Sequence, residues 1–492
     1  MLKQLLKFFV HKLIRRLVCS AITLVLMLTL AACGSTSVRH WTPASDRDTH
    51  DDPAALRPGY GSGEFGMWWP ITEHSSTFNL RVAKAKAGDA QALLELAVLA
   101  SADHHDANAL QTIQPRIDKF VARLKPKVGT AENDLERGHL LYRAMYEDFF
   151  GGDKGELGSY ELEQSRITGI FKTGRYNCIS SAVLFVVLAR EFHLPVRGVL
   201  VPTHAFVEFG THNGKIVEIE TTSSSGFGVT HDERFYKEVA AQWTSSRGLR
   251  PITMEEYQQR KILEPYRFMA IAMINQANQP NMPDEDRGRL VEMAALIDPE
   301  SIEVQRARIQ IYAVEAQALF KRDAHHSMAK MFDTTEPELE KLSAKFAADS
   351  EFMRVLRWTE SLFADALQVV GRSQEAAALV DDALPTVNVN WKDSDTLRKN
   401  FLHVLNDQML VQMTNHNYAS ATKVVRKHIG ACRSDAMCAH NLEVVYGNWS
   451  TDSIYSGNPQ AARTALEECV TVLPDNARCG YALMDFNRRY RF

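Results

Sequence analysis

The chain has 492 residues, of which 45% are hydrophobic and 24% charged, a composition typical of a soluble globular protein. Its formal net charge is −4, and removing the five lysines and arginines of residues 1–32 leaves −9 for residues 33–492. This acidic excess argues against nucleic acid as a partner, and the length predicts two or three domains. The sequence has no glycine-rich phosphate loop and no His-Glu-x-x-His motif, so we expect no cofactor and no metal.

Residues 1–32 predict a lipoprotein signal peptide. Basic residues, with no acidic ones, precede an apolar run from Leu17 to Leu30 that is too short to favour a membrane span. The run ends in Leu-Ala-Ala-Cys33-Gly34, which resembles the bacterial lipobox, whose cysteine receives a diacylglycerol. The resemblance implies a lipid-anchored protein of the bacterial cell envelope that faces the periplasm. The same resemblance implies the outer membrane over the inner one, because no Asp follows Cys33. An ordinary secretory signal is the alternative.

A tether and several helices are predicted next. Residues 33–75 are rich in Ser, Thr, Asp, Pro and Gly and lack periodicity, which indicates a flexible tether. Apolar residues then recur at helical spacing in Ala83–Ala100, Ile113–Leu124 and Leu140–Phe150. We expect these helices to belong to a domain that spans residues 76–258.

Cys178 opens the segment with the clearest chemical meaning. Hydroxyl residues and an apolar stretch follow it as far as Arg190, which predicts a helix that begins at the cysteine. The positive end of the helix dipole would favour the nucleophilic thiolate there. Three strands are predicted after this helix, at Val196–Pro202, Ala205–Phe209 and Lys215–Thr221.

His204 and Glu220 complete a candidate catalytic set. The Asn-Gly loop between Gly210 and Gly214 predicts a β-hairpin. If these two glycines pair, His204 lies directly opposite Glu220, with Cβ atoms about 5 Å apart. A cysteine followed by a histidine and a carboxylate is the order expected of a thiolate nucleophile, its general base and the group that orients the base.

Three simpler interpretations stand beside this one. Cys178 alone could be a small buried hydrophobic residue. His193, at the end of the predicted helix, competes with His204 but is expected to pack or cap. His212, at the hairpin tip, is expected to be solvated.

These segments resemble the transglutaminase-like superfamily of papain-like cysteine enzymes, over roughly residues 140–225. The resemblance rests on the Asn-Cys178 helix start, the His204-Ala-Phe strand and the acidic residue at the end of the following strand. It implies an α+β fold in which Cys178 is the nucleophile, His204 the base and Glu220 the third member, where relatives usually carry Asp. Relatives also place an oxyanion donor upstream of the nucleophile, and the candidates here are Tyr176 and Gln164.

Residues 259–492 predict an all-α helical-repeat domain. Gly371–Pro385 resembles Gly457–Pro474 in its alanine-rich helix and terminal proline. Such helix pairs resemble tetratricopeptide repeats, which implies a concave surface for peptides. An irregular helical domain without repeats is the alternative.

Cysteine usage agrees with an exported protein. Beyond Cys33, one cysteine is Cys178 and the other four lie in the last 61 residues. Disulfides persist in the periplasm, and four cysteines allow three connectivities. A repeat offset of 41 residues favours local pairing, whereas the spacings of six and ten residues fit the alternative of a zinc site poorly. The favoured pairs are Cys432 with Cys438 and Cys469 with Cys479, which leave Cys178 free.

The sequence therefore predicts an envelope-anchored cysteine amide hydrolase or acyltransferase, of peptidase or amidase type, that acts on a protein or peptide. The alternative is a catalytically silent transglutaminase-like scaffold that binds a protein or peptide partner through its helical repeats. The distances among the side chains of Cys178, His204 and Glu220 discriminate between the two.

Overall fold

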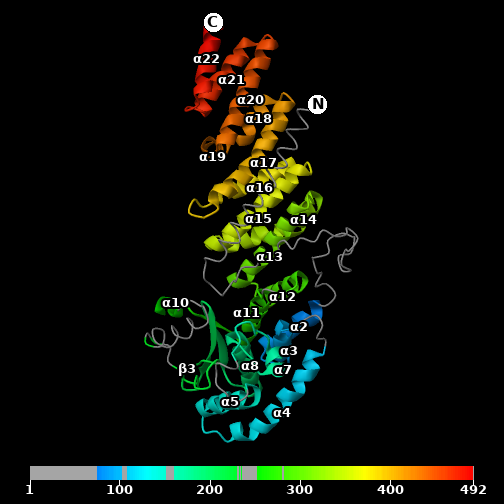
Figure 1. Ribbon diagram of the computed structural model, residues 1–492, viewed down its shortest axis with the longest axis vertical. Helices are drawn as coiled ribbons and strands as arrows, with labels where there is room; N and C mark the ends of the chain where they lie inside the picture. The colour runs from blue at the N-terminus through cyan, green and yellow to red at the C-terminus, as the bar shows by residue number, and fades with distance from the viewer. Residues whose placement is uncertain are drawn as a thin grey trace, which may run out of the picture. The chain divides into compact units, whose positions relative to one another are not determined.

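The computed structural model describes residues 75–101, 108–150, 160–229, 232, 234, 252–279 and 282–490. The predicted signal peptide, Cys33 and residues 34–74 of the predicted tether lie outside this part of the chain. The described residues form two compact units, divided between Arg308 and Ile309 (Figure 1). Among the described helices, none is both long enough and apolar enough to cross a membrane.

The first unit begins with helices that were predicted in outline. The run Ala83–Ala100 was expected to be one helix, but Gly88 adopts a φ of +97° and ends the first of two helices there. Asp89 then accepts a hydrogen bond from the backbone N–H of Ala92 at 2.7 Å, which caps the second helix. The helices before Cys178 are α2 (Ser75–Lys86), α3 (Ala90–Ser101), α4 (Ala109–Gly129), α5 (Asp134–Phe149) and α7 (Ile167–Thr173).

A small antiparallel sheet forms the centre of the first unit. Three of its strands were predicted within a residue or two at each end, and the fourth was missed because it is very short. The strand order is β3-β2-β1-β4. The strands are β1 (Val196–Val201), β2 (His204–Gly210), β3 (Ile216–Ile219) and β4 (Lys261–Leu263).

Helices cover both faces of this sheet. On one face, α8 (Cys178–Glu191) packs against β1 and β2, and α11 (Pro265–Ala277) packs against β1. Gly198 of β1 makes that contact possible, because a Cβ atom there would lie 2.2 Å from the Phe268 ring. On the other face, α10 (Met254–Gln258) covers an apolar cluster around Phe206. The helix α12 (Asp284–Ile297) packs against α11.

Every described element after β4 is helical, as the sequence predicted. The helix α13 (Ile302–Lys321) contains the boundary between the two units. The elements that follow it are α14 (His325–Lys345), α15 (Ser350–Val369), α16 (Ser373–Ala383), the 3-10 helix η2 (Leu384–Thr386), α17 (Ser394–Thr414), α18 (Tyr418–Arg426), α19 (Ile429–Ser434), α20 (Ala436–Tyr455), α21 (Pro459–Val472) and α22 (Ala477–Arg489).

The second unit repeats one helical hairpin. The long helices α15, α17 and α20 pack against one another in order, and each packs against the shorter helix that follows it. The chain reverses after each long helix at a residue with positive φ, namely Gly371, His416 or Gly457. This conformation commonly ends a helix and favours glycine. The likeness to tetratricopeptide repeats in particular stays a prediction.

Both predicted disulfides are confirmed. Cys432 bonds Cys438, and Cys469 bonds Cys479. Among the described cysteines, Cys178 is the only free one, and it is buried. The second unit therefore carries both bridges, whereas the thiol lies in the first unit.

Candidate functional site

Cys178 is the first residue of α8, as predicted. Asn177 caps this helix: its side-chain oxygen accepts hydrogen bonds from the backbone N–H groups of Ile179 and Ser180 at 2.9 and 3.0 Å. The Ser180 hydroxyl in turn accepts from the Asn177 backbone N–H at 3.0 Å, which completes a capping box. The cap holds Cys178 at the positive end of the helix dipole.

His204 is the first residue of β2 and follows the two-residue turn that joins β1 to β2. Thr203 in this turn has a φ of +65°, an unusual conformation for a β-branched residue. The turn delivers the imidazole at the start of the strand, where it stacks on the ring of Phe206 with centroids 6.3 Å apart. The His204 side chain is only 9% exposed.

Glu220 immediately follows β3 and contacts His204 directly. Its Oε2 atom lies 2.6 Å from His204 Nε2. Its other carboxylate oxygen, Oε1, accepts hydrogen bonds from the backbone N–H and the hydroxyl of Thr222 at 3.0 and 2.5 Å. Both oxygens therefore have partners, which fixes the orientation of the carboxylate.

The charge state of His204 depends on both neighbours. Burial by itself would lower the pKa of the imidazole, but the Glu220 carboxylate and the neighbouring Cys178 outweigh it and raise the pKa of His204 to about 10. The structure thus brings together all three residues that the sequence singled out, with His204 between the other two.

The predicted register of the β2–β3 hairpin is wrong by two residues. A Gly210–Gly214 pair would set Val207 opposite Val217, whereas Val207 pairs with Ile219. The loop is longer than expected, because the Thr211 backbone N–H donates to the Lys215 carbonyl at 2.9 Å and closes it. A shift of two residues keeps every side chain on its face of the sheet, so Glu220 still reaches His204, although not as a directly opposed partner.

The expected oxyanion candidates have other contacts. The Tyr176 ring stacks on Phe150 with centroids 4.0 Å apart, and its hydroxyl is 3.5 Å from the Thr222 carbonyl oxygen. The side-chain amide of Gln164 packs against Gly169 of α7. Neither contact involves Cys178.

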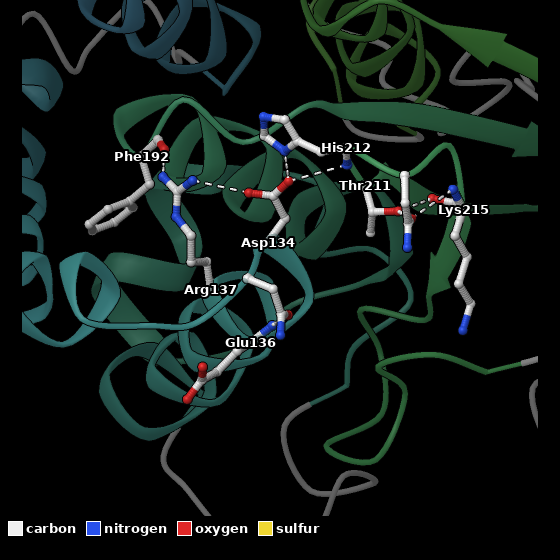
Figure 2. A network of polar contacts seen from close by, with 9 residues as sticks. Asp134, Glu136, Arg137, Phe192, Thr211, His212 and Lys215 are labelled. Atoms are coloured by element: carbon white, nitrogen blue, oxygen red, sulfur yellow. Dashed lines mark hydrogen bonds and ion pairs between the residues drawn. The ribbon is translucent and has the colours of Figure 1, made fainter.

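The two competing histidines lie away from this site. His193 follows α8 with a φ of +54° and is exposed. His212, at the hairpin tip, contacts the carboxylate of Asp134 at the start of α5 (Figure 2). Arg137 donates to the same carboxylate at 3.1 Å and to the Phe192 carbonyl at 2.9 Å. This network joins the hairpin to α5 and to the end of α8. The His212 side chain is 86% exposed, so it is solvated as predicted, and only its contact with Asp134 was not predicted.

Sequence reasoning missed the two threonines that follow Glu220. Thr222 holds the carboxylate, as described above. The Thr221 hydroxyl lies 2.9 Å from that of Ser181, one turn into α8, and so connects the Glu220 loop to the helix of Cys178. The only signal for either role was the position of the Thr-Thr pair directly after the acidic residue.

Comparison with known proteins supports the superfamily for part of the chain. Residues 111–264 match the family model of the transglutaminase-like superfamily. Neither a comparison with curated proteins nor one with solved structures found a match. The matched segment contains the sheet, α8 and the residues Cys178, His204 and Glu220. The first unit therefore contains a transglutaminase-like domain with a small antiparallel sheet, whereas closer likeness to papain stays a prediction.

Proposed function

We propose that this protein is a cysteine amide hydrolase or acyltransferase, of peptidase or amidase type, that acts through Cys178, His204 and Glu220. The observation that carries the proposal is the contact of Glu220 with His204 at 2.6 Å, with Cys178 near enough to the imidazole to help raise its pKa. Because the pKa of His204 is raised, its imidazole can hold the proton that the Cys178 thiol releases when it attacks a substrate.

The first half of the reaction forms a thioester. The Cys178 sulfur attacks the carbonyl carbon of the amide, and the carbonyl oxygen takes up the electron pair. We assign the backbone N–H of Cys178 as a donor to this oxygen, because the Asn177 cap engages the next two N–H groups instead. The His204 imidazolium gives its proton to the nitrogen as the C–N bond breaks, and an amine leaves.

The second half restores the resting state. His204 takes a proton from water while the water oxygen attacks the thioester carbonyl, and the C–S bond breaks to release the acid and the Cys178 thiolate. In an acyltransferase an amine takes the place of the water. Throughout, Glu220 keeps the imidazole in one orientation and stabilises its positive charge. We favour hydrolysis because it is the more general outcome in papain-like enzymes.

A thiol-reactive fluorescent probe tests this proposal on the full chain. We expect rapid labelling of Cys178 at neutral pH, no labelling of that position in Cys178→Ala, and slow labelling in His204→Ala. His193→Ala is the matched control and should label like the wild type. Wild-type protein should also release amine from peptide amides, whereas the Cys178→Ala variant should not. Equal labelling of the wild type and His204→Ala, or no amide cleavage by the wild type, would count against an enzyme.

The burial of Cys178 favours a second candidate. This residue is 8% exposed, so a substrate carbonyl has little access to the sulfur in the conformation described. The second candidate is a catalytically silent scaffold with the same fold. In this candidate the helical repeats would bind a protein or peptide partner in the cell envelope. A folded wild-type protein whose Cys178 does not react with the probe would favour this scaffold.

We further propose that the protein is anchored in the bacterial envelope by a lipid on Cys33 and faces the periplasm, with the outer membrane as the favoured site. The support is the lipobox-like segment Leu30–Gly34 together with two disulfides in the second unit. Cys33→Ser should abolish labelling by palmitate and release the protein from membranes. Continued palmitate labelling of that variant would contradict the assignment.

A further inference from the structure

Three buried tyrosines bind the loop that carries Glu220. Two of them come from α5 and the third directly precedes Asn177, so all three lie outside the sheet. Their hydroxyls reach consecutive backbone carbonyl groups at the start of this loop. The Tyr142 hydroxyl contacts the carbonyl oxygen of Glu220 at 3.0 Å and also that of Ser223. The Tyr146 hydroxyl contacts the carbonyl oxygen of Thr221 at 2.8 Å. The Tyr176 hydroxyl lies 3.5 Å from the carbonyl oxygen of Thr222.

The tyrosines themselves are held in place by aromatic packing. Tyr142 and Tyr176 are 1% exposed and Tyr146 is 6% exposed. The rings of Tyr142 and Tyr146 are 5.1 Å apart, and Phe150 packs between Tyr146 and Tyr176 at 5.0 and 4.0 Å. Burial, and then the neighbouring Tyr142 and Tyr176, raise the pKa of Tyr146, so its hydroxyl stays protonated and remains a donor.

The sheet alone does not hold Glu220. The pairing of β3 with β2 ends at Ile219, so Glu220 has left the ladder. Its backbone N–H donates to the Gly226 carbonyl at 2.9 Å, and the Gly226 N–H donates to the Tyr142 hydroxyl at 3.0 Å. The position of the carboxylate therefore depends on a loop whose carbonyl groups are bound by the tyrosines.

We propose that Tyr142, Tyr146 and Tyr176 are positioning residues: their hydroxyls fix the backbone of the Glu220 loop and thereby keep the carboxylate on His204. The inference rests on the proposed function, since the position of Glu220 matters chemically only if His204 and Cys178 react. Each tyrosine acts through the backbone of the Glu220 loop, which its hydroxyl contacts.

The rate at which iodoacetamide alkylates Cys178, measured from pH 5 to 10, tests the proposal without a substrate. Tyr142→Phe and Tyr146→Phe remove one hydroxyl each and keep the ring. We expect the midpoint of the rate profile to rise by about one pH unit in each variant, with roughly tenfold slower alkylation below the midpoint. Tyr257→Phe is the matched control, because it also removes one tyrosine hydroxyl, and that hydroxyl bonds the side chain of Glu218 within β3. Its profile should match that of the wild type.

A double-variant cycle separates positioning from mere support of the fold. Glu220→Gln should shift the profile in the same direction, and adding Tyr146→Phe to it should cause no further shift, because the tyrosine acts through Glu220. The inference would be overturned if a tyrosine variant had a lowered melting temperature but an unchanged alkylation profile. Additive shifts of that profile in the Glu220→Gln, Tyr146→Phe double variant would also overturn it. Failure to find a cleaved amide would count against the proposed function alone. A wild-type profile with the midpoint of an ordinary thiol would overturn both.

Discussion

Gly226 packs against the backbone of Glu220 so closely that a Cβ atom at position 226 would lie 2.0 Å from the Glu220 carbonyl oxygen. No side chain fits there unless the loop moves. The identity of a residue six positions beyond Glu220 is thus coupled to the carboxylate that contacts His204.

Gly226→Ala should displace the Glu220 loop and destabilise the first unit by about 1–3 kcal/mol. Alkylation of Cys178 should slow as well, because the carboxylate moves with its backbone. Gly288→Ala is the control: it lies in α12 with no atom near its Cβ position, and alanine in a helix should stabilise by about 0.5–1 kcal/mol. Thermal unfolding and the rate of Cys178 alkylation should be measured for both variants. A Gly226→Ala variant as stable as the wild type would contradict the close packing of Gly226 on Glu220.

Glu220→Asp should lower turnover of an amide substrate as much as Glu220→Gln does. The aspartate keeps the charge but is one methylene shorter, and the loop is held too firmly to move toward His204. The glutamine keeps the reach but loses the charge. We expect turnover of any amide substrate to fall by roughly 10²-fold in both, since a displacement of about 1 Å can have that effect. An aspartate variant with nearly wild-type activity would show that the loop adapts and that charge alone suffices.

The protonation of His204 should make the first unit less stable at high pH. The pKa of His204 is about 10 in the folded state against 6.5 unperturbed, so folding takes up a proton between these values. The stabilisation is fully present below about pH 6.5 and is lost as the pH rises through about 10.

Thermal unfolding at pH 6, 8 and 10 measures this effect. The difference in melting temperature between the wild type and His204→Gln should shrink steadily from pH 6 to pH 10. His193→Gln, a change at an exposed site, should show no such trend. A difference that is constant across the range would mean that His204 is not stabilised as a cation.

Reduction of the disulfides should destabilise the second unit and leave the first unchanged. Closing a short loop contributes roughly 2–3 kcal/mol per bridge. Hydrogen exchange with and without reductant should show faster exchange in α19–α22 and no change in α8. Without reductant, an alkylating reagent should modify Cys178 in the unfolded protein but none of the four C-terminal cysteines. Modification of any of those four would contradict the pairing.

The sequence predicted the residues of the candidate site better than the contacts that hold them in place. Cys178 opens a helix after Asn177, as expected, and His204 starts a strand one residue earlier than expected. Glu220 lies just after β3 and not within the predicted strand. The Gly88-Asp89 break carried a readable signal, a helix-ending glycine followed by a capping aspartate, which the alanine-rich periodicity on both sides concealed.

Other features could not be predicted from local patterns. The register of the β2–β3 hairpin depends on the Thr211–Lys215 hydrogen bond, which an Asn-Gly pair does not specify. The contacts of Tyr142 and Tyr146 with the Glu220 loop join residues more than 70 positions apart. No pattern within a single helix or strand encodes such a contact.

The two disulfides join helices that follow each other in the chain, α19 to α20 and α21 to α22. Each bridge joins two cysteines that are neighbours along the chain, so the four thiols can pair in the order of synthesis. Consecutive pairing of this kind requires no later exchange of partners, so we expect a thiol oxidant without isomerase activity to be enough to form both bridges. The buried Cys178, synthesised long before these four, has no cysteine partner near it in sequence as the chain emerges.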